Sequence, residues 1–90
     1  MLVALIAHDK PDSLSIRMDN RRDHLAYIQS THVVQQAGPL LDPAGTMIGS
    51  MVILDVDTME AAQRWADNDP YTRAGLFADA QLVHWNRVIG

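Results

Sequence analysis

The sequence contains no cysteine among its 90 residues. This absence excludes disulfide bonds, thiolate nucleophiles and metal sites built on cysteine. It also fits a reducing compartment, and we expect a cytoplasmic protein. Lys10 is the only lysine, the formal net charge is −4, and no basic stripe runs along the chain. We therefore expect no nucleic-acid partner.

Several other signals are missing. The apolar start, residues 1–7, lacks a basic beginning and is too short for a signal peptide or a membrane span, so we expect no membrane partner. Neither a glycine-rich phosphate loop nor a serine nucleophile elbow is present. The four histidines show no H-x-x-x-H or H-x-H spacing. We therefore expect no metal site.

The chain has the size and composition of one small globular unit. Its length fits a single domain, 1–90, and 48% of its residues are apolar. A chain this short buries only about 60–65% of the surface that it exposes when unfolded. Its own core is therefore small, and association with a second copy would add to it.

Hydrophobic patterns and turn residues predict the element order β-α-β-β-α-β. This is the order of the ferredoxin-like α+β fold, an antiparallel sheet with two helices on one face. The first helix is expected to start at Asp19 or Asn20, after a helical turn over 13–18. Asp57 is the expected N-cap of the second helix, with Glu60 completing a capping box. The predicted strands cover residues 2–8, 33–41, 48–56 and 76–89, and the predicted helices cover residues 19–31 and 57–69.

Both faces of the predicted sheet are apolar. In the third strand Val52 and Leu54 alternate with Met51 and Ile53, and the first strand alternates in the same way. Two helices cover only one face, and a monomer rarely exposes an apolar patch of several hundred Å². We therefore predict a homodimer joined by the open sheet faces. The alternative is a monomer with a moderately apolar open face.

Two polar residues suggest a proton-transfer site. His24 lies beside the apolar stripe of the first helix, and histidine has the unperturbed pKa nearest neutrality. Asp69 lies where the second helix stops at Pro70, and a carboxylate orients the second nitrogen of a catalytic histidine well. Each residue also has a structural explanation without function. His24 could simply pack on its helix, and Asp69 before Pro70 is a common way to end a helix.

Other polar side chains could complete such a site. Arg17 and Arg21 precede His24 on the same helix side and fit either an anion contact or a surface paired with Asp12, Asp19 or Asp23. Ser50 could donate to a bound oxygen or satisfy local backbone groups. Tyr71 fits a pocket wall or the core. His84-Trp85-Asn86 leaves open an oxygenase pocket on a related fold, although such aromatic residues usually pack a core.

Together these segments resemble the YCII (YciI-like) family over nearly the whole chain. The segments that carry the likeness are Met1-Leu2, Asp9-Lys10-x-Asp12-Ser13-Leu14, Arg17, Arg21-x-x-His24-Leu25, Ala37-Gly38-Pro39, Gly49-Ser50, Glu60-Ala61-Ala62-x-x-Trp65-Ala66 and Asp69-Pro70-Tyr71. The resemblance implies a ferredoxin-like dimeric α/β barrel. One departure is a short loop between Pro39 and Gly49, so the substrate cannot be carried over.

The resemblance also implies a site. It assigns a His-Asp dyad to His24 and Asp69 in a pocket near the dimer interface, with Pro70 holding Asp69. It places Arg17 and Ser50 at substrate-binding positions. Chemistry assigned within the family includes dehydrochlorination of a chlorinated hydroxyhydroquinone, and the fold is similar to that of muconolactone isomerases.

We therefore expect a small lyase or isomerase that moves a proton on a hydroxylated aromatic or related ring compound. His24 would be the base, Asp69 would fix its tautomer, and a small anionic or phenolic ligand would lie against Arg17 and Ser50. This chemistry requires no cofactor. Two alternatives remain: a non-catalytic dimer that binds a small ligand in the same pocket, and an oxygenase of related fold.

Overall fold

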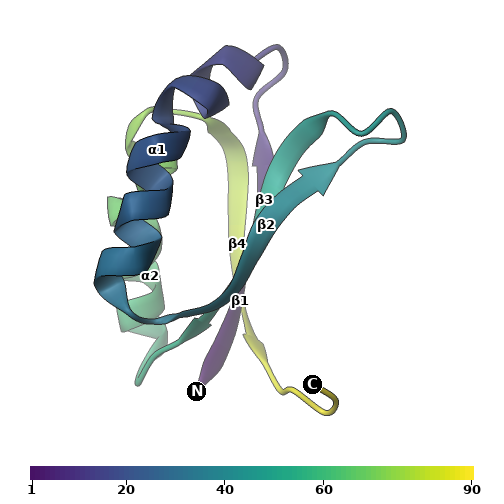
Figure 1. Cartoon of the computed structure of the whole chain (residues 1–90). Helices are drawn as coiled ribbons and strands as arrows, with labels where there is room; N and C mark the ends of the chain where they lie inside the picture. The colour runs from purple at the N-terminus through teal and green to yellow at the C-terminus, as the bar shows by residue number, and fades with distance from the viewer.

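The computed structural model describes all residues from Met1 to Gly90 and has the predicted α+β order with one short helix added. Four strands form a single antiparallel sheet in the order β2-β3-β1-β4, and the helices lie on one side of it (Figure 1). The elements are β1 (Leu2–Asp9), α1 (Leu14–Thr31), β2 (Val34–Leu41), β3 (Met47–Asp55), α2 (Met59–Asn68), α3 (Pro70–Arg73) and β4 (Phe77–Trp85).

The core lies between the two central strands and α2. Alternate residues of a strand point to one face, so Val3 and Leu5 of β1 share the helix-covered side with Val52 and Leu54 of β3. The side chains that meet them from α2 are Ala62, Trp65 and Ala66. The inner face of the sheet is thus filled by stiff aliphatic side chains at one end of the molecule.

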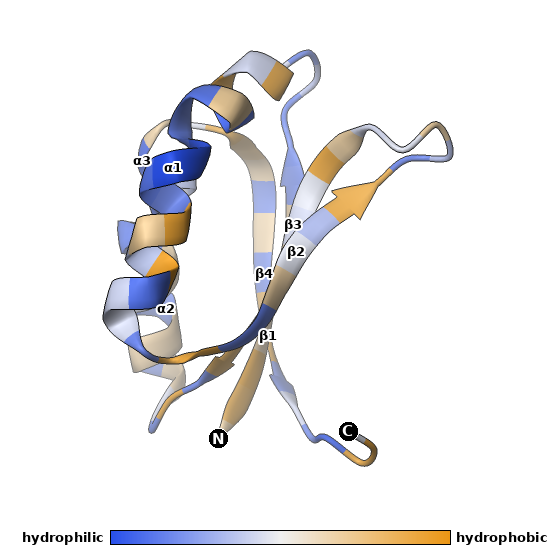
Figure 2. Ribbon diagram, viewed as in Figure 1, coloured by the Kyte–Doolittle hydropathy of each residue, from blue (hydrophilic) through white to orange (hydrophobic).

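Helix α1 is unusual because the buried residues on it are polar. A surface helix normally turns a wide apolar stripe toward its sheet, whereas the buried residues of α1 are Arg17 and His24. Figure 2 shows the central part of α1 as strongly hydrophilic, with hydrophobic residues at its start and again in its second half. The sheet beside this helix therefore faces polar groups that need partners.

Three predicted boundaries are wrong. α1 begins at Leu14, and the predicted caps Asp19 and Asn20 lie inside it. Asn20 Nδ2 donates to the Ile16 carbonyl. Thr58, and not Asp57, caps α2: its Oγ1 accepts from the Ala61 N–H at 3.0 Å. This cap puts Glu60 at the second helical position, so the expected capping box does not form.

The third wrong boundary is the end of the last strand. β4 stops at Trp85, whose partner Leu2 is the first residue of β1, so no backbone remains for later residues to pair with. Val88 and Ile89 lie beyond it with 84% and 91% of their surface exposed. The expected edge position of Pro39 is confirmed, because β2 is an outer strand.

Gly49 allows a close approach in the middle of the sheet. A Cβ at this position would lie far inside van der Waals contact with the Ala7 carbonyl oxygen and would also press on the Leu40 side chain. Glycine in a strand often marks such an approach. The missing side chain at Gly49 lets β3 lie close to β1 directly before Ser50, which faces the helices.

Candidate functional site

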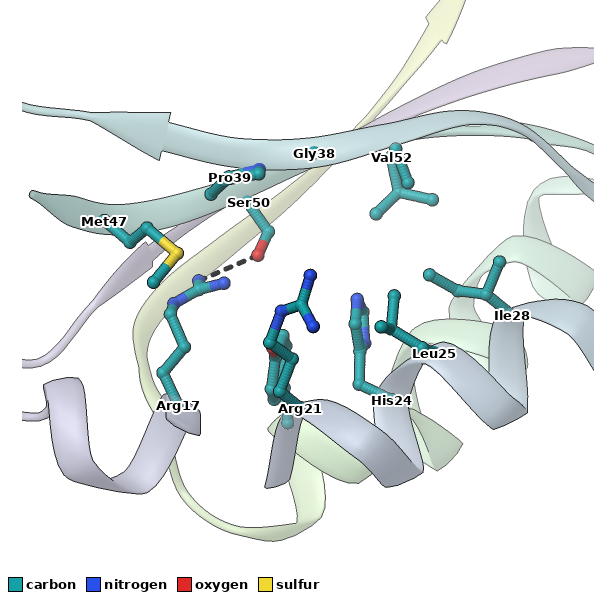
Figure 3. A pocket seen from close by; sticks show the side chains of 12 residues that line it. Arg17, Arg21, His24, Leu25, Ile28, Gly38, Pro39, Met47, Ser50 and Val52 are labelled. Atoms are coloured by element: carbon teal, nitrogen blue, oxygen red, sulfur yellow. Dashed lines mark hydrogen bonds between the residues drawn. The ribbon is translucent and has the colours of Figure 1, made fainter. Parts of the chain in front are cut away.

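A cavity of about 160 Å³ lies between α1 and the strands β2 and β3. Figure 3 shows that α1 supplies one wall and the sheet the other, with Arg21 and His24 facing Ser50 and Val52 across it. The residues that line the cavity are Arg17, Arg21, His24, Leu25, Ile28, Ala37, Gly38, Pro39, Met47, Ser50, Val52 and Tyr71.

The histidine of this cavity is held by a carboxylate. His24 Nδ1 lies 2.7 Å from Asp69 Oδ1, and the two side chains expose only 8% and 1% of their surface. The separation lies within the range expected for a hydrogen-bonded pair. Because an ionised carboxylate only accepts hydrogen bonds, Nδ1 carries the proton, and Nε2 is left as the basic nitrogen.

Asp69 is positioned by the junction of two helices. It ends α2 and caps α3, with Pro70 at the first position of the short helix. Its extended backbone, φ −60° and ψ 129°, is the conformation that a following proline favours. Asp69 Oδ1 also accepts from the Tyr71 N–H at 3.1 Å, whereas Oδ2 is buried without a partner. Pro70 thus favours the extended backbone conformation of Asp69.

Tyr71 packs between the histidine and an arginine. Its ring stacks on His24 at a centroid distance of 3.9 Å and an angle of 14°, and Arg17 Cζ lies 4.8 Å from the same ring centroid. Both contacts are favourable geometries for aromatic and cationic groups. Tyr71 therefore fixes the plane of the imidazole from one side while Asp69 fixes its rotation.

Arg17 forms an ion pair that the sequence did not reveal. Its Nε and Nη2 donate to the two carboxylate oxygens of Asp9 at 2.8 and 2.9 Å, and Nη2 also donates to Ser50 Oγ at 2.8 Å. Arg17 exposes only 2% of its surface. The expected surface partners Asp12, Asp19 and Asp23 are therefore wrong, because Asp9 at the end of β1 turns inward to meet this guanidinium.

The surroundings shift the pKa of Arg17 in two directions. Burial by itself lowers its pKa, but the hydrogen bonds and negative charge of Asp9 outweigh burial and raise the pKa above the ordinary value. The group thus stays charged at all accessible pH values. Ser50 Oγ accepts from this cation, and its own hydroxyl proton has no acceptor within the chain. That proton is free to donate to an oxygen in the cavity.

Both tyrosines of the chain should resist ionisation in the folded protein. Burial raises the pKa of Tyr71 against the opposing charge of Arg17, and burial with a contribution from Asp69 raises the pKa of Tyr27. Tyrosine ionises near pH 10 in an unfolded chain. Because the folded pKa values are higher, the free energy of unfolding should fall as the pH rises above about 10.

An alkaline titration measures this effect directly. We expect almost no phenolate absorbance from the native protein at pH about 10, where half of the tyrosines in the urea-unfolded protein would be ionised. Phenolate should then appear together with loss of the circular dichroism signal. Half-ionisation near pH 10 with the fold intact would contradict this expectation, and the two-tyrosine count makes the signal easy to assign.

A family model described as the YCII-related domain matches residues 1–86. The chain belongs to this family. Protein YciI of Escherichia coli O6:H1 is 39% identical over 97 aligned residues that cover 98% of this chain and 99% of the relative. An uncharacterised protein of Haemophilus influenzae is 32% identical, with 98% and 99% of the two chains covered. The resemblance drawn from the motifs is confirmed.

Solved structures agree on the fold. The 5-chloro-2-hydroxyhydroquinone dehydrochlorinase TftG of Burkholderia phenoliruptrix AC1100, in complex with 2,5-dihydroxybenzoquinone, has a TM-score of 0.88 and 36% identity, with 96% of this chain and 94% of TftG covered. An antibiotic biosynthesis monooxygenase has a TM-score of 0.60 at 16% identity, covering 99% of this chain and 100% of the other. The second likeness shows the fold alone.

Four of the six predicted site residues line the cavity, Arg17, His24, Ser50 and Tyr71. Asp69 does not line it but contacts His24 Nδ1. Pro70 lies outside it and acts only on Asp69. Their roles in chemistry stay predictions. Asp9 was missed. No group of three His, Asp or Glu side chains gathers as a metal site would require. No helix is long and apolar enough to cross a membrane.

Proposed function

We propose that this protein is a small lyase or isomerase that transfers protons on a hydroxylated ring compound without a cofactor. The observation that carries this proposal is the buried contact between His24 Nδ1 and Asp69 Oδ1, which leaves Nε2 as a base at the edge of a ring-sized cavity. The likeness to TftG, a dehydrochlorinase with a bound quinone, supports a reaction of the lyase type.

His24 Nε2 would take a proton from a ring hydroxyl. Asp69 stabilises the imidazolium that forms, and the stacked ring of Tyr71 keeps it in plane. The electron pair moves into the ring, and the proton is returned to the ring carbon that bears the leaving group, which gives a keto tautomer. Isomerisation ends there. In a dehydrochlorination His24 Nε2, free again, takes a second hydroxyl proton. The electron pair of that O–H bond forms a carbonyl, the ring double bond shifts, and the electrons of the C–Cl bond leave with chloride.

Arg17 and Ser50 would stabilise the oxyanion that forms when the hydroxyl loses its proton. The Ser50 hydroxyl has a proton to donate, and the bond that Ser50 Oγ accepts from Arg17 polarises it. Arg17 Nη1 is the guanidinium nitrogen that neither Asp9 nor Ser50 uses. Donors fixed before the reaction are the most effective form of electrostatic help.

The direct test is chloride release from 5-chloro-2-hydroxyhydroquinone, followed together with quinone absorbance. We expect both signals from the wild-type protein and neither from His24→Ala. Proton exchange between solvent deuterium and the ring carbons of unchlorinated hydroxyhydroquinone would report the isomerase step alone. Ligand binding without release or exchange for either compound would overturn the enzyme proposal and favour a binding protein with the same pocket.

We also propose that two copies of the chain associate through the open sheet face. This face presents the exposed apolar side chains Met51, Val83 and Trp85 around the buried Ala4 and Ile53. The cavity lies on the opposite side of the sheet, so each chain would keep a complete site. The expected nearness of pocket and interface stays a prediction.

Light scattering at micromolar concentration should therefore give about twice the mass of one chain. Met51→Lys places a charge in the middle of the open face and should shift the protein to monomer, with a lower thermal midpoint because association stabilises the fold. Gln29→Lys, an exposed change on α1, is the matched control and should leave the mass unchanged. A stable wild-type monomer would count against the dimer.

A further inference from the structure

Arg21 is an exposed arginine that has no hydrogen-bonding or ionic partner within the chain. It lines the cavity from α1, and Figure 3 shows its guanidinium extended from the helix toward the sheet, between Arg17 and His24. No hydrogen bond or ion pair of the structure includes it, in contrast to the fully engaged Nε and Nη2 of Arg17. An arginine that faces a cavity without a partner has all five donors available.

Arg21 differs from the other basic residues of the cavity in having no partner within the chain. Arg17 is compensated by Asp9, and His24 is held by Asp69. Arg21 is therefore the uncompensated cation among the lining residues. Its field reaches the ring beneath it, because it lowers the pKa of Tyr71 while burial raises it. Because Arg21 is exposed, a ligand that reaches it can supply the negative partner that it lacks within the chain.

The size of the cavity limits what can supply that charge. A volume of about 160 Å³ is close to that of an engineered cavity of about 150 Å³ that holds one benzene ring. The walls between the polar groups are apolar, with Leu25 and Ile28 on the helix side and Val52 on the sheet side. A flat single ring would lie between them, with polar substituents at its edge.

We propose that Arg21 is the residue that selects an anionic ring compound, holding an ionised oxygen of the ligand while the ring fills the apolar part of the cavity. The assignment rests on the proposed function in one respect, that His24 acts on the same ring. In this proposal Arg21, and not Arg17, binds the negative charge that the ligand already carries. Arg17 would then stabilise the oxyanion that develops beside Ser50 and hold the Ser50 side chain in position.

Calorimetric titration with two probes of equal ring size tests the proposal. The anionic probe is 2,5-dihydroxybenzoquinone, a vinylogous acid that is ionised at neutral pH, and the neutral probe is hydroquinone. Wild-type protein should prefer the anion. Arg21→Gln should weaken binding of the anion by about 10- to 100-fold, as expected for a charge-assisted contact, and should leave the affinity for hydroquinone within about twofold.

Arg22→Gln is the matched control. It removes the same charge from the next residue of the same helix, which is exposed and does not line the cavity. It should change neither affinity by more than about twofold. Arg21→Lys keeps the charge without the fork and should fall between wild type and Arg21→Gln. The side chain of Arg21 is exposed and makes no hydrogen bond or ion pair within the chain, so the thermal midpoint of its variants should match that of the wild type.

The outcomes separate this inference from the proposed enzyme. Anion binding that Arg21→Gln leaves intact, or a wild-type protein that does not prefer the anion or binds neither probe, would overturn the role of Arg21 whatever the turnover of His24 proves to be. A charge-selective loss in Arg21→Gln in a protein without turnover would keep the role of Arg21 and overturn the lyase.

Discussion

Replacing His24 by alanine should lower turnover of a ring substrate by about 100- to 10,000-fold, the range that general-base catalysis contributes. His24 Nε2 is the only histidine nitrogen that faces the cavity, since Asp69 occupies Nδ1. Binding of the ring should weaken far less than turnover, because the apolar walls and Arg21 remain. The result should therefore appear in kcat and leave KM nearly unchanged.

The same site predicts a graded effect at Asp69. Asp69→Asn keeps the shape and a hydrogen-bonding oxygen but removes the negative charge that stabilises the imidazolium. It also allows the amide to present its N–H₂ group, which favours the wrong tautomer of His24. We expect a loss of turnover close to that of His24→Ala, and the double variant should lose little more, because the pair acts as a unit.

His84→Ala is the control for these variants. His84 is exposed on β4, away from the cavity, so its removal should leave kcat unchanged. Thermal midpoints must accompany each rate, since His24 and Asp69 are buried. A His24→Ala protein that folds and turns over at the wild-type rate would remove the base from the mechanism, and Asp69 would return to a role as the cap of α3.

The second large effect concerns stability. Arg17→Met should lower the free energy of unfolding by about 3–5 kcal/mol, because it leaves the Asp9 carboxylate buried without its cation. For a domain of this size that corresponds to a fall in the thermal midpoint of roughly 12–40 °C, at about 4–8 °C per kcal/mol. Urea unfolding with a fixed m-value measures it.

A double variant separates the contribution of the Arg17–Asp9 ion pair to stability from the cost of removing one partner. Arg17→Met combined with Asp9→Leu removes both charges and should recover most of the lost stability, since apolar pairs often replace buried ion pairs without cost. Arg64→Met on the exposed side of α2 is the control and should change the free energy of unfolding by less than about 0.5 kcal/mol. An additive double variant would mean that Arg17 and Asp9 are not coupled.

Hydrophobic patterns and turn residues together were sufficient to predict the element order, although α1 buries polar residues and not an apolar stripe. The α+β order and the family are confirmed, and β2 lies at the edge as Pro39 indicated. The predicted helix boundaries were wrong where a short polar residue that often caps a helix does not do so here. Asp19 lies inside α1, and Asp57 precedes the residue that caps α2, Thr58.

The candidate site was predictable only in part. His24 and Asp69 were paired from a helix stop and a family likeness, and the structure places them in contact, although their chemical role stays a prediction. Asp9 could not be found in this way, because it lies eight residues before Arg17 and the intervening turn brings them together. The helical pattern alone does not distinguish Arg17, which turns inward, from Arg21, which faces the cavity, and only the family likeness singled out Arg17.

The β2–β3 hairpin shapes one side of the cavity independently of the helices. Ala37, Gly38, Pro39 and Met47 of this hairpin form one wall, whereas the proposed base and its carboxylate come from the helices. The turn between the strands is self-contained, since Asp42 Oδ1 accepts from the N–H groups of Ala44 and Thr46. Insertions there would lengthen the wall and deletions would shorten it, while His24 and Asp69 keep their spacing. A change in loop length would therefore reshape this wall of the cavity without moving His24 or Asp69.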